Sequence, residues 1–414
     1  MFQRPRGTRD FGPVEMEIRQ MVLGIMRSTA IKHGFKEIQM PIFEDLELFK
    51  KKSGPGIVEE LYAFKDKGGR DISLRPEMTA QVMRFYVSDL STQPKPLKLF
   101  YFGPCFRYEN PQSGRFREFF QVGAEIIGMQ TPETDAEAIA LAVSQIRSVG
   151  LKNYDVRIGY IGIYRDILKG LNLKDEEITE ALHLLDKNKA DEVTKFLLQK
   201  KVQKSTIDHI LSLRNLKGGT NILDILEDSP AKGYLKEMIE SVHSLGIKKC
   251  NIDLGIIRGL DYYTGMVFEI DAPALGAEKQ ICGGGSYDLV PLFGGEQVFT
   301  TGFAIGFDRV LIALNKEGFE YQMARMDAYV IALNDSSRKK VFEIVSQLRE
   351  KGISADFDTM RRSLSKSLKY ASLINAKSVI IVGDKELARG VVTIRDMSSG
   401  EQKEITIDEI AKVI

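Results

Sequence analysis

LFYFGPCFRYENPQSGRFREFFQVGAEII, residues 99–127, is the stretch of sequence that decides the fold. Both halves alternate with a period of two, which predicts two strands, and the polar loop near residues 110–114 predicts that they pair antiparallel. One face of the first strand carries Leu99, Tyr101, Gly103, Cys105, Arg107 and Glu109. One face of the second strand carries Arg115, Arg117, Phe119, Gln121, Gly123 and Glu125. The pattern predicts a sheet face with arginines at the loop end and a Gln–Gly–Glu floor deeper in.

The polar residues of this hairpin suit two kinds of ligand. Arg107 and Arg115 suit a polyphosphate, because a guanidinium matches phosphate oxygens through paired hydrogen bonds. Gln121 and Glu125 suit a small polar ligand with amine or imidazole donors. An ordinary amphipathic hairpin with a charged edge would show the same alternation. From residues 99–127 alone, both interpretations stay open.

Length and composition bound the rest of the chain. Its 414 residues predict two to four domains, and 43% hydrophobic with 28% charged residues is typical of a soluble globular protein. The net charge of +1 gives no global basic field, so any polyanion site must be local. The three cysteines lack CxxC spacing and the four histidines are scattered, which predicts no metal cluster and a reducing compartment. Without a membrane-length apolar run or an apolar signal core, we expect a cytoplasmic protein with no membrane partner.

The N-terminal region predicts a helix over residues 13–33 and a strand over residues 35–40, which ends at Pro41 because proline cannot donate to a ladder. These two elements fit a dimer edge, although generic packing would use the same pattern. Residues 57–64 and 71–75 predict two further strand pieces that flank a turn.

A helix start is predicted directly after the second of these pieces. Pro76 suits the first helical position, which places Glu77 and Thr79 in the first turn, where the helix dipole favours a carboxylate. Ordinary capping explains such an acidic residue. The functional alternative is that Glu77 and Thr79 face a pocket and bind an ammonium group.

Residues 163–249 differ in composition and periodicity from the rest of the chain. They are rich in Leu, Lys, Glu and Asp with helical periodicity, which predicts a mainly helical inserted domain. A basic run in this segment could meet a nucleic-acid backbone, or it could be a solvated helix face. The run comprises Lys195, Lys200, Lys201 and Lys204.

Strand and glycine patterns return in residues 250–322. Residues 280–288 predict a strand whose glycines leave one surface bare, which asks for a reason such as close approach of a ligand. A strand then passes into a helix, with Asp308 as the expected N-cap and Arg309 in the first turn. A cation there opposes the helix dipole, which suggests that a ligand compensates it.

A boundary is expected near residues 323–326. Beyond it, residues 326–414 alternate strand and helix and close with a hairpin and a last helix, which predicts a small α/β domain with a mostly parallel sheet. No Walker loop occurs in the chain, so we do not expect a P-loop nucleotide site.

Several separated blocks of the chain resemble the histidyl-tRNA synthetases of class II. The blocks are RPRGTRD (residues 4–10), LRPEMTA (residues 74–80), FRYE with QVGAE (residues 106–109 and 121–125) and RGLDYY (residues 258–263). The resemblance implies an α+β catalytic core with a mixed, mainly antiparallel sheet and a helical insert, followed by a C-terminal α/β anticodon-binding domain. The implied parts are the first part of the core (1–162), the insert (163–249), the second part of the core (250–322) and the anticodon-binding domain (326–414).

The resemblance implies histidine–tRNA ligase activity. Histidine would be activated with ATP and Mg²⁺ to histidyl-adenylate and then passed to the 3′ end of tRNA(His), by a chain that forms a homodimer. Arg107 would hold the α-phosphate, and Arg258 would bridge the carboxylate and the α-phosphate in the place of a metal, so these two are the expected catalytic residues. Arg115 would meet the γ-phosphate, and Arg309 and Phe116 would flank the adenine.

Histidine recognition is implied for a second set of residues. Glu77, Thr79 and Gln121 would bind the α-amino group. Glu125 and Tyr263 would bind the two imidazole nitrogens, with Tyr262, Tyr287 and Arg258 completing the site. In the loop that would read the start of the acceptor stem, Asn110 stands where many bacterial members carry arginine, while Gln112 is kept. A second departure is Ser286, where the family often has arginine.

Two rival functions follow from the same resemblance. The chain could be a catalytically silent paralogue that binds histidine and regulates ATP phosphoribosyltransferase, but such proteins usually lack the anticodon-binding domain and the RGLDYY block. It could also be a class II synthetase for proline, threonine or glycine. Those enzymes do not need the pair formed by Glu125 and Tyr263.

Overall fold

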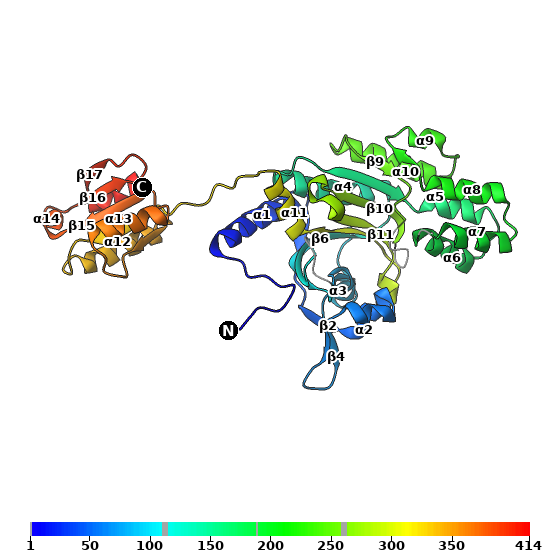
Figure 1. Ribbon diagram of the computed structural model, residues 1–414, viewed down its shortest axis with the longest axis horizontal. Helices are drawn as coiled ribbons and strands as arrows, with labels where there is room; N and C mark the ends of the chain where they lie inside the picture. The colour runs from blue at the N-terminus through cyan, green and yellow to red at the C-terminus, as the bar shows by residue number, and fades with distance from the viewer. Residues whose placement is uncertain (1, 110–114, 188, 258–262) are drawn as a thin grey trace. The chain divides into compact units, whose positions relative to one another are not determined.

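The computed structural model describes residues 2–109, 115–187, 189–257 and 263–414. The chain divides into two compact units, residues 1–320 and residues 321–414. Each unit has its own sheet, and Figure 1 shows both sheets with the helices that cover them.

The predicted hairpin forms the heart of the first unit. Strands β5 (Leu97–Phe106) and β6 (Glu118–Gly128) pair antiparallel, with Gly103 opposite Gln121 and Tyr101 opposite Gly123. Burial alternates from Tyr101 to Phe106, as the sequence predicted, but Phe100 is buried as well. Strand β5 ends before Arg107 and β6 begins after Arg117, so the arginines near the loop lie outside both strands. Residues 110–114 lie outside the described part of the chain.

The hairpin belongs to a mixed sheet in the order β1-β5-β6-β12-β11-β10-β7-β9-β8. Neighbours are antiparallel except for β1 with β5 and β7 with β9, which are parallel. The mainly antiparallel core predicted from the sequence is therefore confirmed. The other strands are β1 (Lys36–Glu37), β7 (Asp155–Tyr160), β8 (Lys217–Gly218), β9 (Asn251–Asp253), β10 (Tyr263–Asp271), β11 (Gln280–Tyr287) and β12 (Phe299–Gly306).

Helices cover both faces of this sheet. On one face lie α1 (Pro13–Lys32), α4 (Pro132–Ser148) and α11 (Phe307–Lys316). The other face packs against α3 (Thr79–Phe85), where an apolar cluster joins helix residues to strand residues such as Tyr101 and Tyr287. Beside α3 lie α2 (Leu46–Ser53) and a small sheet of β2 (Phe43–Asp45), β4 (Asp71–Leu74) and β3 (Ala63–Lys65).

Several local predictions in this region were wrong. The strand expected over residues 35–40 is only β1, and the strand expected over residues 57–64 begins as the 3₁₀ turn η1 (Pro55–Glu60). Helix α3 begins at Thr79 rather than Pro76. Its predicted first turn lies outside the helix, because the Arg75 N–H donates to the Ile42 carbonyl and the Arg75 carbonyl accepts from the Phe106 N–H.

The helices predicted for residues 163–249 are present and gather beside β9 and β10 (green in Figure 1). They are α5 (Gly162–Lys169), α6 (Asp175–Asp186), α7 (Ala190–Gln199), α8 (Lys204–Leu213), α9 (Ile222–Ile225) and α10 (Pro230–Ser244). Helix α10 packs against α4, so this segment touches the layer that covers the large sheet.

The second unit holds a sheet in the order β14-β13-β15-β16-β17. Pairing is parallel within β14-β13-β15 and antiparallel from β15 to β17, so the prediction of a mostly parallel sheet holds for one half only. Helices α12 and α13 cover opposite faces, each over its own apolar cluster. The elements are β13 (Ala328–Ala332), α12 (Arg338–Glu350), β14 (Ala355–Phe357), α13 (Leu364–Leu373), β15 (Ser378–Val382), α14 (Asp384–Leu387), β16 (Val391–Asp396), β17 (Gln402–Thr406) and α15 (Ile410–Val413).

Candidate functional site

A cavity of about 600 Å³ lies in the first unit between the large sheet and α2 and α3. It gathers side chains that are far apart in the sequence and that sequence reasoning had singled out. The predicted residues that line it are Glu77, Thr79, Arg107, Arg115, Phe116, Gln121, Tyr263, Tyr287 and Arg309. The predicted residues Asn110, Gln112, Arg258 and Tyr262 lie outside the described residues.

The predicted residue Glu125 is not among the residues that line the cavity, but its buried carboxylate, 1% exposed, lies directly behind the lining residue Tyr287 at one end. Its Oε1 accepts a hydrogen bond of 3.0 Å from Tyr101 Oη, and its Oε2 accepts one from Tyr287 Oη. The ring of Tyr263 packs edge-on against Tyr287, with centroids 6.2 Å apart. Burial raises the pKa of Glu125 to about 7, although the hydroxyl donors oppose the shift.

Two glycines make room for this arrangement. A side chain at Gly302 would overlap Glu125 Oε2 and lie 2.6 Å from the Ala124 carbonyl oxygen. A side chain at Gly123 would lie 2.5 Å from Tyr101 Oη. Both positions therefore exclude a Cβ because a side chain of the protein itself fills the space.

The glycines of β11 have a similar explanation. A Cβ at Gly285 would meet the ring of Tyr263 at 2.8 Å, and one at Gly284 would meet Phe268 at 2.6 Å. These glycines admit the protein's own aromatic rings, which is a reason that does not require the close ligand approach suggested by the sequence.

The carboxylate of Glu77 lies at the same end of the cavity. It accepts from the backbone N–H groups of Thr79 (2.7 Å) and Ala80 (3.2 Å), so it caps α3 from just before the helix. Lys52 Nζ, from α2, pairs with it at 2.8 Å, and both side chains are largely buried. Burial favours the neutral acid, but the charge of Lys52 and these hydrogen bonds outweigh it and lower the pKa of Glu77.

Three arginines of the lining lie close enough to influence one another, and we call this part of the cavity the arginine end. Arg107 Nε donates to the Pro76 carbonyl at 3.1 Å, Arg309 Nη1 donates to the Gln280 carbonyl at 2.8 Å, and Arg115 Nε pairs with Glu278 at 3.1 Å. Arg309 also pairs with Glu278, at 3.2 Å. Burial and the neighbouring charges of Arg115 and Arg107 lower the pKa of Arg309, although Glu278 opposes the shift. Glu278 thus supplies part of the compensation that the sequence reasoning assigned to a ligand.

Asp308 does not cap α11, as the sequence had suggested, because the N-cap is Gly306. Its buried carboxylate accepts from the Phe120 N–H at 2.7 Å and pairs with Arg19 and Arg9, each at 2.8 Å. The guanidinium of Arg9 lies over the ring of Phe116, 3.5 Å from its centroid. Asp308, which itself lines the cavity, therefore joins α11, α1 and the N-terminal segment.

A family model described as Histidyl-tRNA synthetase matches residues 7–310. The chain belongs to the histidyl-tRNA synthetase family. A second model, described as Anticodon binding domain, matches residues 327–414. The histidine–tRNA ligase of Archaeoglobus fulgidus is 42% identical over 414 residues, which cover 100% of this chain and 99% of that protein. The histidine–tRNA ligase of Methanocaldococcus jannaschii is 44% identical and covers 99% of each chain.

Solved structures agree with this membership of the histidyl-tRNA synthetase family. The apo histidyl-tRNA synthetase of S. aureus matches with a TM-score of 0.78 and 30% identity, covering 100% of this chain and 99% of that one. A Bacillus halodurans structure titled as an ATP phosphoribosyltransferase regulatory subunit/histidyl-tRNA synthetase matches with a TM-score of 0.77 and 23% identity, covering 92% of this chain and 98% of that one. At that identity the second likeness concerns the fold alone.

Sequence reasoning missed two residues that hold the carboxylates of this synthetase's site, Tyr101 beside Glu125 and Lys52 beside Glu77. Tyr101 had been placed on the correct face, and the signal for its role was the glycine directly opposite it in the hairpin, Gly123. Lys52 gave no such signal, because it stands in a run of three lysines near the end of α2 that is typical of a solvated helix terminus. Only the tertiary contact with Glu77 distinguishes Lys52 from its two neighbours.

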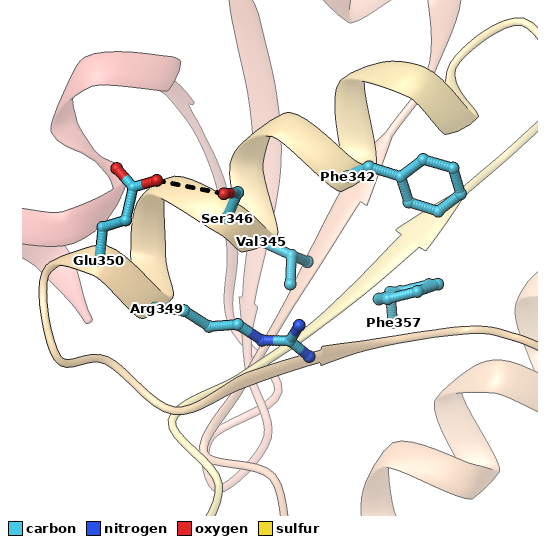
Figure 2. A pocket seen from close by; sticks show the side chains of 6 residues that line it. All are labelled: Phe342, Val345, Ser346, Arg349, Glu350 and Phe357. Atoms are coloured by element: carbon cyan, nitrogen blue, oxygen red, sulfur yellow. Dashed lines mark hydrogen bonds between the residues drawn. The ribbon is translucent and has the colours of Figure 1, made fainter.

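A second hollow, of about 590 Å³, lies in the anticodon-binding unit between α12 and β14 (Figure 2). The rings of Phe342 and Phe357 pack edge-on with their centroids 5.0 Å apart, and Arg349 Nε donates a hydrogen bond of 2.9 Å to the Ala355 carbonyl. Ser346 Oγ donates to Glu350 at 3.3 Å. The polar groups of this hollow are engaged locally, so we assign the chemistry to the cavity of the first unit.

The described residues also bear on metal-dependent and membrane-embedded classes of function. Among these residues, no group of three or more His, Cys, Asp or Glu side chains is arranged to hold a metal ion. None of the described helices has the length and apolar character needed to cross a membrane.

Proposed function

We propose that this chain is a histidine–tRNA ligase, which activates L-histidine with ATP and transfers the histidyl group to the 3′ end of tRNA(His). Family membership over residues 7–310 and the full-length similarity to histidine–tRNA ligases support the activity. The single observation that carries the proposal is the cavity itself, whose lining includes the Glu77 carboxylate, the Tyr287 side chain that holds the buried Glu125, and three arginines. The rival reading as a regulator of ATP phosphoribosyltransferase is not favoured, since the match to the ligases includes the anticodon-binding unit.

Histidine would occupy the end that holds Glu125. An imidazole N–H is a donor, and the buried Glu125 carboxylate is an acceptor held in place by Tyr101 and Tyr287. Tyr263 lies beside Tyr287 and would meet the second ring nitrogen. A buried polar group left unpaired by an analogue costs binding energy, so such a slot rejects amino acids without an imidazole by factors that can reach about 10⁴.

The α-amino group would bind Glu77, Thr79 and Gln121. Glu77 is ionised and fixed by Lys52 and two backbone N–H groups, so its position does not depend on the ligand. An ammonium group joining this carboxylate would gain a charge-assisted hydrogen bond without having to order the acceptor first. Tyr262 and Arg258, which the family resemblance adds to the histidine site, belong to the same proposal.

ATP would occupy the arginine end. The histidine carboxylate attacks the α-phosphorus, and the extra negative charge of the pentacoordinate phosphorus needs fixed cations rather than a side-chain nucleophile. Arg107 would hold the α-phosphate, Arg115 the γ-phosphate, and Arg309 the adenine and phosphates opposite Phe116. Arg258 would bridge the histidine carboxylate and the α-phosphate. Bound triphosphate would compete with Glu278 for Arg115 and Arg309.

Mg²⁺ would enter as the complex with ATP. Magnesium in nucleotide sites keeps several waters and takes phosphate oxygens with one or two carboxylates. That coordination fits a cavity whose described residues offer no group of three or more potential ligands. The carboxylates that line the cavity are those of Glu60, Glu77, Glu109, Glu269 and Asp308.

The remaining parts would serve tRNA and assembly. We propose that residues 1–162 and 250–322 form the catalytic core. The helical segment of residues 163–249 would contact the acceptor stem, and residues 326–414 would read the anticodon. Asn110 and Gln112 would meet the start of the acceptor stem. The edge formed by α1 and β1 is the proposed homodimer contact, and we propose a cytoplasmic location.

The proposal is tested by charging purified tRNA(His) with labelled histidine in the presence of ATP and Mg²⁺. We expect label at the 3′ end of tRNA(His) and none on a tRNA for another amino acid. A chain that binds histidine but does not charge tRNA(His) would contradict the proposed function and favour the regulatory reading.

A further inference from the structure

Asp135 is a fully buried carboxylate in the first turn of α4, the helix that covers one side of the large sheet. It is not among the residues that line the cavity. Its Oδ1 accepts from Ser286 Oγ at 2.7 Å and from Thr301 Oγ1 at 2.5 Å, and its Oδ2 accepts from Tyr234 Oη at 2.9 Å. Burial raises the pKa of Asp135 to about 6, while the three hydroxyl donors oppose the shift. At neutral pH the group is therefore an ionised acceptor that three separate elements share.

Two of its partners lie directly behind the proposed histidine end. Ser286 on β11 and Thr301 on β12 face each other in the strand register. The next residue on β11 is Tyr287, which donates to Glu125, and the next on β12 is Gly302, which lies against Glu125. Because side chains alternate along a strand, Ser286 and Thr301 point to one face of the sheet, and Tyr287 and Gly302 belong to the other. Hydrogen bonds that hold Ser286 and Thr301 therefore also hold the backbone that positions Tyr287 and Gly302.

The third partner comes from the helical segment of residues 163–249. Tyr234 stands on α10, and its ring stacks on Tyr160 at the end of β7, with centroids 5.0 Å apart and planes inclined by 10°. Its hydroxyl is the part that reaches Asp135. A helix that contributes no residue to the lining of the cavity is thus connected to Tyr287 through one carboxylate and one serine.

We propose that Asp135 is a positioning residue for histidine recognition, which locks β11 to β12 behind Tyr287 and Glu125 and ties both strands to α10. The inference rests on the proposed function, because it names what tunes that site. Tyr287 stands on β11 and Glu125 on β6, and β12 lies between these two strands. The hydrogen bond between Tyr287 and Glu125 therefore depends on how β11 is aligned with β6 across β12. Fixing Ser286 and Thr301 to one acceptor removes the sliding freedom that would loosen this bond.

Single hydroxyl deletions test the proposal with little change in shape. Thr301→Val and Tyr234→Phe each remove one donor to Asp135. Thr300→Val and Tyr164→Phe are matched controls, because Thr300 is equally buried on β12 but contacts Met83, and the Tyr164 hydroxyl donates to the Leu254 carbonyl. Thr301→Ser keeps the donor and should restore the unmodified behaviour.

The readout is ATP–pyrophosphate exchange, with KM for histidine and for ATP and the melting temperature measured for each full-length variant. Losing one hydrogen bond to a charged acceptor should raise KM for histidine about fivefold to tenfold in Thr301→Val and Tyr234→Phe, while KM for ATP stays within about twofold. Both controls should keep KM for histidine within about twofold of the unmodified chain.

The outcomes separate the inference from its premise. If the unmodified chain shows no histidine-dependent exchange, the proposed function itself fails. If that chain is active but both variants match their controls in KM for histidine, the positioning role of Asp135 is overturned. It is equally overturned if both KM values and the melting temperature change together, since that pattern marks general destabilisation. A rise in Thr301→Val alone would overturn the connection to α10.

Discussion

Glu125 concentrates at one residue the selectivity that we propose. It is buried, it accepts from two tyrosines, and glycines on neighbouring strands leave room for it and for Tyr101. Glu125→Gln keeps the size of the side chain but removes its charge. Because a hydrogen bond to a charged group contributes about 1.5–3 kcal/mol, KM for histidine should rise about 10- to 100-fold in ATP–pyrophosphate exchange at pH 8, above the Glu125 pKa of about 7.

The same variant should change KM for ATP by less than about threefold, since the arginine end of the cavity is untouched. Glu118→Gln is the matched control, because this residue begins the same strand and faces the other side by alternation. Equal losses for histidine and ATP in Glu125→Gln would count against Glu125 as the reader of the imidazole ring.

The raised pKa of Glu125 makes a separate prediction for stability. Its folded pKa of about 7 exceeds the ordinary value of 4.5, so the folded chain holds an extra proton between these limits. The free energy of unfolding should therefore fall as pH rises from about 4.5 to about 7. Relative to the unmodified chain, Glu125→Gln should gain stability over that window, which urea unfolding at pH 5.5 and pH 8 would measure. A stability difference that is the same at both pH values would show that Glu125 is ionised throughout.

Single residues also mark the limit of sequence reasoning. The alternation in residues 99–127 correctly placed Tyr101, Gln121 and Glu125 on one face, because a strand allows only two faces. Lys52 could not be found this way, since its role depends on the distance from α2 to Glu77, which no local pattern contains.

At the scale of whole elements, tertiary contacts override local propensity in two places. Residues 75–77 carry a good helix-start pattern but stay outside the helix, because hydrogen bonds to residue 42, to β5 and to Arg107 occupy their backbone groups. Asp308 has the chemistry of an N-cap, yet it serves Arg9, Arg19 and the Phe120 N–H instead. Strand pairing and helix spans were predicted better, because periodicity over many residues outweighs such single contacts.

The close packing of β12 against β6 gives a prediction at this scale. Gly302→Ala would force a methyl group into Glu125 and the Ala124 carbonyl, and overpacking of this kind costs about 1–3 kcal/mol of stability. Affinity for histidine should fall as well, because Glu125 must move. Gly24→Ala in α1 is the control, since a Cβ there meets nothing within 4 Å and alanine stabilises a helix interior by about 0.5–1 kcal/mol. Thermal unfolding that ranks Gly302→Ala at or above the unmodified chain would contradict this packing.

At the scale of the whole molecule, two compact units divide the chain at residues 320 and 321, close to the boundary expected from sequence at residues 323–326. The first unit contains the cavity, and the second matches an anticodon-binding domain. Amino-acid activation and tRNA reading are therefore proposed for separate units, and activation alone can be measured without tRNA.

ATP–pyrophosphate exchange, run with each of the common amino acids in turn, tests the central claim most directly. The cavity joins a proposed histidine end, where Tyr287 holds Glu125 and Glu77 faces the amino group, to three arginines suited to a triphosphate. We predict exchange with histidine alone, and its near abolition in Arg258→Ala with histidine binding retained. Exchange with proline, threonine or glycine, or undiminished exchange in Arg258→Ala, would contradict the account.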